Sequence, residues 1–122
     1  MWGGGVRSDR ELLELAAKAA GYVIDQRASF MTWRYSRRLA LLNPQGGHTI
    51  WNAGEDAGDA LRLAVKAGLI IGAYAHFSTV DFLLNDRIET VKVWHSEASN
   101  DDCAATLLAI VRAAAAIGEQ MP

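Results

Sequence analysis

Apolar residues recur at helical spacing in three stretches of the chain, and each stretch begins with a residue that can cap a helix. Ser8 and Glu11 match the capping box that begins a helix. Asp56 precedes a second run that continues to Ala67, and Asn100 precedes the third. The apolar positions are Leu12, Leu13, Leu15, Ala16, Ala19 and Ala20 in the first stretch, Leu61, Ala64 and Val65 in the second, and Leu107, Leu108, Val111, Ala114, Ala115 and Gly118 in the third.

Residues typical of strands fill most of the intervals between these helices. Aromatic and β-branched side chains in residues 22–42 favour extended chain, and a short strand is expected at 49–51. After the second helix, three strand-like segments follow, and the last two are separated by the tight turn Asn85-Asp86. The pattern predicts an antiparallel meander. Its three segments span residues 69–75, 79–84 and 88–95.

The order of these elements, helix, strands, helix, strands, helix, predicts the fold class. It favours an α/β (α+β) fold in which a mainly antiparallel sheet is covered by three helices. A chain of 122 residues fits one domain. We expect the glycine-rich residues 1–7 to be flexible and residues 8–122 to form a single α/β sandwich domain.

Composition excludes several classes of protein. A net charge of −2 argues against a protein that binds duplex DNA, which normally needs an excess of Lys and Arg. The longest apolar run, residues 67–77, is shorter than the ~20 residues that span a bilayer. Cys103 is the single cysteine and has no partner for an internal disulfide, and the N-terminus lacks a secretory signal. These features predict a cytoplasmic protein without a membrane span.

The apolar content suggests an assembly of several copies. Hydrophobic residues make up 51% of the chain, and four tryptophans must be placed on a small domain. Part of this apolar area is expected to lie in a subunit interface, so we predict a homo-oligomer. The alternative is that the many alanines raise the count without forming an interface.

Two groups near the second helix suggest ligand binding. Asp56 and Asp59 lie at the same helix end, where their carboxylates could hold a divalent cation or accept hydrogen bonds from a ribose. As a purely structural pair they would cap the helix. Trp51 and Asn52 place an aromatic plane beside an amide, which is a common way to stack on a base and read its edge. The alternative for Trp51 is a place in the core.

The densest basic group is the segment WRYSRR, which carries Arg34, Arg37 and Arg38 with Trp33 and Tyr35 between them. Guanidinium groups beside aromatic rings suit a phosphate-bearing nucleotide. An equally plain alternative is a solvated strand edge whose charges prevent pairing with another sheet.

Catalytic and metal-binding patterns are missing from the sequence. His48, His76 and His95 do not show the spacing of metal ligands. His95, Ser96 and Glu97 have the residue types of a hydrolytic triad, but neighbours along a strand point to opposite faces. No phosphate-binding loop, dinucleotide fingerprint or nucleophile elbow is present. We therefore expect a protein that is not an enzyme and that uses neither a cofactor nor a metal.

Three blocks of the sequence, at residues 10–21, 51–69 and 104–122, resemble the small phage proteins that carry the phage ABA-sandwich domain. The middle block in that family reads more like WNPLxDDGDALRLAVKL. This chain differs from the pattern at Ala53, Gly54 and Ala57. The resemblance implies an α-β-α sandwich of phage or prophage origin, acting in the host bacterial cytoplasm. The matching residues are Trp51, Asn52, Asp56, Gly58, Asp59, Ala60, Leu61 and Arg62.

The functional hypothesis follows from that origin. It describes a phage-encoded, non-enzymatic anti-defence protein that sequesters a nucleotide immune signal of the cyclic dinucleotide or cyclic ADP-ribose type. In it, Trp51 stacks on a base, Asn52 reads the edge of that base, and Asp59 contacts ribose. The phosphates are neutralised by arginines. The expected ligand-binding residues are Trp51, Asn52, Asp56, Asp59, Arg62, Arg34, Arg37 and Arg38.

Two alternative functions remain open at this point. The first is a protein-binding phage accessory module that inhibits a host enzyme through a sheet edge or an exposed aromatic patch. The second is a nucleotide-degrading phosphodiesterase that uses Asp56, Asp59 and a histidine with a metal ion.

Overall fold

The computed structural model describes residues 7–122, which contain four α-helices and two three-stranded antiparallel sheets. Sheet A has the strand order β1-β2-β3, and sheet B has the order β4-β5-β6. The mixed α+β class expected from the sequence is confirmed. The elements are α1 (Asp9–Ala19), β1 (Val23–Ile24), α2 (Gln26–Ser36), β2 (Leu39–Leu42), β3 (His48–Trp51), α3 (Ala57–Ala67), β4 (Ile70–Ala73), β5 (Phe77–Leu84), β6 (Arg87–Trp94), the 3₁₀-helix η1 (His95–Ala98) and α4 (Asp102–Gln120).

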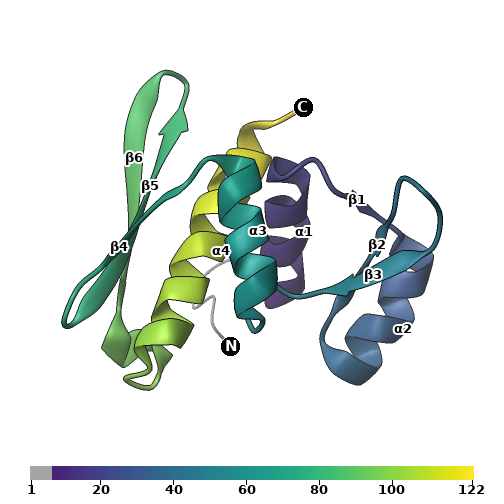
Figure 1. Cartoon of the computed structure of the whole chain (residues 1–122), viewed down its shortest axis with the longest axis horizontal. Coiled ribbons are helices and arrows are strands. Elements are labelled where there is room, and N and C mark those ends of the chain that lie inside the picture. The colour runs from purple at the N-terminus through teal and green to yellow at the C-terminus, as the bar shows by residue number, and fades with distance from the viewer. Residues whose placement is uncertain (1–6) are drawn as a thin grey trace.

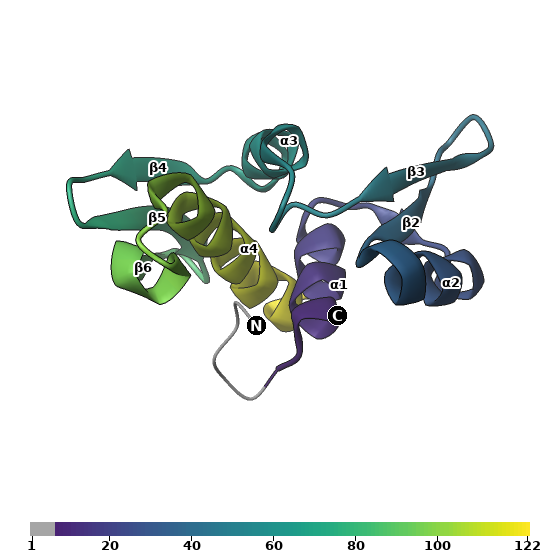
Figure 2. The same cartoon turned by 90° about the horizontal axis from the view of Figure 1, so that it is seen from below.

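The helices α1, α3 and α4 lie between the two sheets (Figure 1). Sheet B is at the left of that view, and sheet A with α2 is at the right. Seen from below, α4 runs beside sheet B and α1 lies nearer to sheet A (Figure 2). The expected single covered sheet is therefore divided into two sheets. The flexible segment predicted at residues 1–7 lies outside the described residues, apart from Arg7.

Two of the predicted helix caps are confirmed. The Ser8 hydroxyl accepts a hydrogen bond from the backbone N–H of Glu11 at 3.2 Å. The Asp56 carboxylate accepts one from the backbone N–H of Asp59 at 2.9 Å, directly before α3. Each cap satisfies a backbone donor that the first turn of a helix leaves without an intrahelical partner.

The predicted cap of the last helix is wrong by one residue. Asp101 caps α4, and its carboxylate accepts a hydrogen bond from the N–H of Ala104 at 3.0 Å. Asn100 has a φ of 60° in the left-handed region, whereas an N-cap residue needs an extended backbone. Asn100 instead ends the turn that follows η1.

The extended chain predicted for residues 22–42 is wrong over 26–36, which form α2. Asp25 caps this helix by accepting a hydrogen bond from the N–H of Ala28 at 3.0 Å. The buried Ser29 hydroxyl accepts from the N–H of Ala40 at 2.9 Å and donates to the Ala40 carbonyl at 3.2 Å. The β propensity of this segment is therefore overridden by a cap and by docking onto β2, both of which outweigh a weak local preference.

The predicted meander is confirmed in sheet B. Strands β5 and β6 pair through their full length, from Phe77 with Trp94 to Leu84 with Arg87. Asn85 and Asp86 form the connecting turn with φ values of 51° and 63°. Positive φ at both central residues is typical of the two-residue hairpin turn whose twist matches that of the flanking strands.

The core is formed largely by the small-residue face of α4, which packs against α1, α3 and sheet B. Gly118 is required at the contact with α1, because a Cβ there would lie 2.0 Å from the carbonyl oxygen of Leu15. The aliphatic side chains of Leu13, Leu63 and Val80 belong to this core and are fully buried. Among residues 7–122, no helix combines the length and apolarity needed to cross a membrane.

Candidate functional site

Asn52 lies at the junction between β3 and α3, and its polar groups bind within the protein. Its side-chain amide nitrogen donates to the carbonyl of Arg37 at 2.6 Å, and its amide oxygen accepts from the N–H of Gly54 at 2.8 Å. Its backbone N–H donates to the Asp59 carboxylate at 3.0 Å. Asn52 is 1% exposed. It joins the end of α2 to the start of α3, which is a structural role.

The two aspartates of the predicted site also serve the start of α3. Asp59 is 5% exposed, and its second oxygen accepts a hydrogen bond from the Arg62 guanidinium at 2.9 Å. Both oxygens of Asp59 are thereby occupied, and Asp56 caps the helix. Of the two sequence-based alternatives for this pair, helix capping describes the observed geometry. The Arg62 side chain is 67% exposed and reaches over the surface of α3.

Trp51 is 2% exposed and belongs to the core. Its ring meets the ring of Tyr22 edge to face, with the centroids 5.7 Å apart. The indole Nε1 is buried without a hydrogen-bond partner among the described residues. With its ring enclosed in this way, Trp51 offers no open face on which a base could stack.

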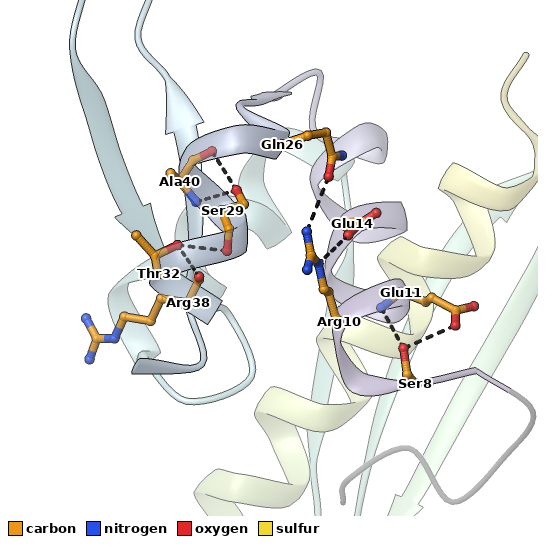
Figure 3. Close-up of polar contacts among 9 residues, drawn as sticks. All are labelled: Ser8, Arg10, Glu11, Glu14, Gln26, Ser29, Thr32, Arg38 and Ala40. Atoms are coloured by element: carbon orange, nitrogen blue, oxygen red, sulfur yellow. Dashed lines mark hydrogen bonds and ion pairs between the residues drawn. The ribbon is translucent and has the colours of Figure 1, made fainter. Parts of the chain in front are cut away.

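Arg34, Arg37 and Arg38 lie at the C-terminal end of α2 with exposed side chains. The strand-edge alternative is therefore wrong for them, because they belong to a helix end. Within residues 7–122 none of the three guanidinium groups forms an ion pair. Figure 3 shows the Arg38 guanidinium extending away from the helix, while the Arg38 carbonyl accepts a hydrogen bond from Thr32 at 2.6 Å. The positive charge also favours this helix end electrostatically.

The outward face of α2 adds apolar and aromatic side chains to this cluster. Tyr35 is 76% exposed, Phe30 58% and Met31 48%. The Arg34 guanidinium lies 6.0 Å from the Tyr35 ring centroid. Sequence reasoning missed this surface because it expected extended chain; the available signal was Asp25 as a cap before helical spacing. We call the following residues the α2 surface: Phe30, Met31, Arg34, Tyr35, Arg37 and Arg38.

The charge of the α2 segment is one-sided. Residues 26–38 contain four of the twelve Lys and Arg residues of the chain and no Asp or Glu. Because the whole chain carries a net charge of −2, this helix forms a local positive region on a slightly acidic protein. Such a region favours an anionic ligand.

The contact between Asp25 and His48 joins α2 to sheet A. The imidazole Nε2 of His48 on β3 lies 2.6 Å from the Asp25 carboxylate. The hydrogen bond from the N–H of Ala28 is the largest cause that lowers the pKa of Asp25, followed by the hydrogen bond with His48. A further link joins α2 to α1, where the Arg10 guanidinium donates to the Gln26 side chain at 3.4 Å (Figure 3).

Two cavities lie outside the predicted site. One of about 580 Å³ lies between α1 and β1 and is lined by charged groups such as Glu11 and Lys18 together with Val23. The other, of about 370 Å³, lies where α4 meets sheet B and includes His95 and Cys103. None of the eight predicted ligand-binding residues lines either cavity.

At the start of α4, three side chains whose atoms can ligate a metal lie close together. The ligand atoms of Asp101, Asp102 and Cys103 lie within 4.8 Å of one another, and all three residues are exposed. Neither Asp56 nor Asp59 belongs to this group. The negative charge of Asp102, the largest cause, raises the pKa of the Cys103 thiol, so the thiol stays protonated rather than becoming a nucleophilic thiolate.

No protein-family model, curated protein or solved structure matches this chain. The resemblance to the phage ABA-sandwich domain therefore stays a prediction.

Proposed function

We propose that this protein is a non-enzymatic binding protein that captures a nucleotide on the α2 surface. The observation that carries the proposal is the cluster of Arg34, Arg37 and Arg38, exposed and without ion-pair partners among the described residues, beside the exposed ring of Tyr35. An aromatic face next to several guanidinium groups suits a ligand that combines a base with phosphates.

The side chains at this surface have separate roles in binding. Arg34 and Arg38 supply donors in the planar fork geometry that fits phosphate oxygens. Tyr35 takes the stacking role that the sequence suggested for Trp51. Asn52 acts at a distance from the ligand, because its hydrogen bond to the Arg37 carbonyl fixes the backbone from which that guanidinium extends.

A binding role fits the acidic residues better than a hydrolytic one. A metal-dependent phosphodiesterase would need free carboxylate oxygens, but Asp59 uses both oxygens within the domain and Asp56 caps α3. The wider hypothesis, a phage protein that sequesters a cyclic dinucleotide or a cyclic ADP-ribose, supplies the ligands to test first.

The test is a panel of cyclic dinucleotides, cyclic ADP-ribose isomers and linear mononucleotides. We expect one class to raise the melting temperature, since a ligand that binds only the native state stabilises it by mass action. Denaturation should then release the ligand chemically unchanged. If no member of the panel shifts the melting temperature, the proposal is wrong, and a released ligand that has been altered would point to an enzyme.

Variants locate the site in the same assay. The double variant Arg34→Ala/Arg38→Ala should abolish the ligand-induced shift but leave the melting temperature without ligand nearly unchanged, because both side chains are exposed. Arg87→Ala is the matched control, since Arg87 is also exposed but lies at the end of sheet B.

A protein-binding module is the second candidate, and the exposed Phe30 and Met31 favour it. Aromatic residues and Met are enriched in protein interfaces, whereas the binding of a nucleotide does not require two further apolar side chains on α2. If Arg38→Ala loses a host partner while no nucleotide binds to any form of the protein, this candidate replaces the first.

A further inference from the structure

The outer face of sheet B, the face turned away from α4, is open. Ser78, Val80 and Phe82 of β5 are buried, while the residues that alternate with them point outward. Strands β4 and β6 add their own outward residues to this face. The outward residues are Ile70, Gly72 and Tyr74 on and after β4, Phe77, Thr79, Asp81 and Leu83 on β5, and Ile88, Thr90, Lys92 and Trp94 on β6.

Along β5 and β6, this outer face is apolar at its two ends and polar in the middle. Leu83 and Ile88 form one end and are 63% and 77% exposed. Tyr74 and Trp94, at 56% and 48%, lie with Phe77 at the other end. Solvated antiparallel faces normally carry polar side chains, so large exposed apolar groups at both ends indicate a surface that becomes covered.

The aromatic end is already ordered. The rings of Tyr74 and Phe77 stack with centroids 4.8 Å apart, and Trp94 meets Phe77 edge to face at 5.3 Å. A Cβ at Gly72 would lie 2.9 Å from the Tyr74 ring, so the glycine makes room for this arrangement. Side chains that are fixed before association lose less conformational entropy on binding.

The charges on the outer face complement one another. Asp81 pairs across the sheet with Thr90, and Thr79 pairs with Lys92, so the carboxylate and the ammonium lie diagonally on neighbouring strands. The Lys92 ammonium lies 4.1 Å from the ring centroids of both Phe77 and Trp94. A surface that carries a negative charge on one side of its middle and a positive charge on the other side can pair with a copy of itself.

We propose that the outer face of sheet B is the interface through which two copies of this chain associate. A two-fold axis that lies between the two faces makes them match. It crosses the strands between the Asp81–Thr90 pair and the Thr79–Lys92 pair. It places Leu83 and Ile88 of each copy over Phe77 and Trp94 of the second copy. It also brings each Lys92 ammonium near the Asp81 carboxylate of the second copy. The two sheets then pack face to face, as in a sandwich.

The size of the face sets the expected strength. Three strands of up to eight residues give a face of roughly 14 Å by 26 Å, an area of about 360 Å². This area is smaller than the ~800 Å² per partner that typical stable complexes bury. The dimer is therefore weak and depends on concentration. The net charge of −2 per chain adds little repulsion between copies.

Sedimentation velocity of the full chain tests the proposal from about 1 µM to about 500 µM, a range that covers the dissociation constants of weak interfaces. We expect a monomer–dimer equilibrium that Ile88→Lys weakens at least about tenfold, as for a truncated or blocked anchor in an interface. Val65→Lys is the matched control, because Val65 on α3 is 74% exposed and lies away from sheet B. It should dimerise like the unchanged protein.

A charge exchange tests the two-fold pairing itself. Lys92→Glu and Asp81→Lys should each weaken self-association, because each variant carries two like charges on the outer face. A mixture of the two variants should form a mixed dimer, since opposite charges then meet at both positions.

Three results would overturn the proposal. A monomer at all concentrations would leave this face for a different partner, and unchanged dimerisation of Ile88→Lys would place the contact elsewhere. Failure of the mixed dimer, with both variants folded by circular dichroism, would exclude the two-fold arrangement. None of these results bears on nucleotide binding, which uses α2.

Discussion

At the scale of single residues, Asn52 shows how a position that suggests ligand recognition can serve the fold. We predict that Asn52→Ala lowers the free energy of unfolding by about 1–3 kcal/mol, because the part-buried hydrogen bonds to the Arg37 carbonyl and from the Gly54 N–H are lost. Urea denaturation measures the change. Arg37→Ala is the control, since it keeps the carbonyl that Asn52 contacts, and a loss as large as that of Asn52→Ala would contradict the assignment.

Asp25 gives a prediction for acid stability. Its pKa is lower in the folded state than its ordinary value of 3.8, so the folded state holds the ionised form more strongly. The stabilisation is fully present well above the unfolded pKa of 3.8 and is lost as the pH falls below that value and through the folded pKa. Asp25→Asn, which can still cap α2, should make the melting temperature less dependent on pH there.

The same experiment separates the causes of the Asp25 shift. His48→Gln should keep part of the acid dependence, because the hydrogen bond from the N–H of Ala28, the largest single cause that lowers the pKa of Asp25, remains. If His48→Gln removed the dependence completely, the contact with His48 rather than the helix cap would be the main cause.

At the scale of elements, the sequence predicted the parts whose signals are local. The caps at Ser8 and Asp56 and the Asn85-Asp86 turn need only a few neighbouring residues, and all three are present. Helix α2 was missed although Asp25 is a local signal for its cap, because the contact between Ser29 and Ala40 that holds the helix joins two elements. The propensity of Phe30 or Trp33 for strands could not show this.

The same distinction between local and non-local signals applies to the candidate site. The clustering of Arg34, Arg37 and Arg38 is a property of adjacent positions and was visible in the sequence. Their place at a helix end was not, and neither was the hydrogen bond from Asn52 to Arg37, because it spans fifteen positions. The burial of Trp51 depends on Tyr22 and on the packing of the whole core.

The contact between α1 and α4 gives a prediction at this scale. Gly→Ala in an exposed helix interior normally stabilises by about 1 kcal/mol. Gly118→Ala should instead destabilise by about 1–3 kcal/mol or more, since the added methyl group overlaps the Leu15 carbonyl oxygen. Gly58→Ala in α3 is the matched control: a Cβ there lies 3.2 Å from the Asp56 carboxylate oxygen, so a small shift of that side chain makes room for it. If the two variants changed the free energy of unfolding equally in denaturant, the close approach of Gly118 to the Leu15 carbonyl would be contradicted.

At the scale of the whole molecule, the two proposed surfaces lie at opposite ends. The α2 surface belongs to the end with sheet A, the outer face of sheet B forms the other end, and three helices separate them (Figure 1). Association through sheet B therefore leaves α2 uncovered. The two proposals can then fail or succeed separately, since Ile88→Lys changes only the second surface and Arg34→Ala/Arg38→Ala only the first.

The separation of the sheets by the helices also determines how a pair of copies would respond to ligand. Each arginine cluster would lie at a far tip of an elongated two-fold particle, so a single small molecule could not touch both. The two tips would fill without communicating, and the saturation curve would be a simple hyperbola with a Hill coefficient near one. Sensitivity to ligand would then be graded rather than switch-like, with capacity set only by the number of chains.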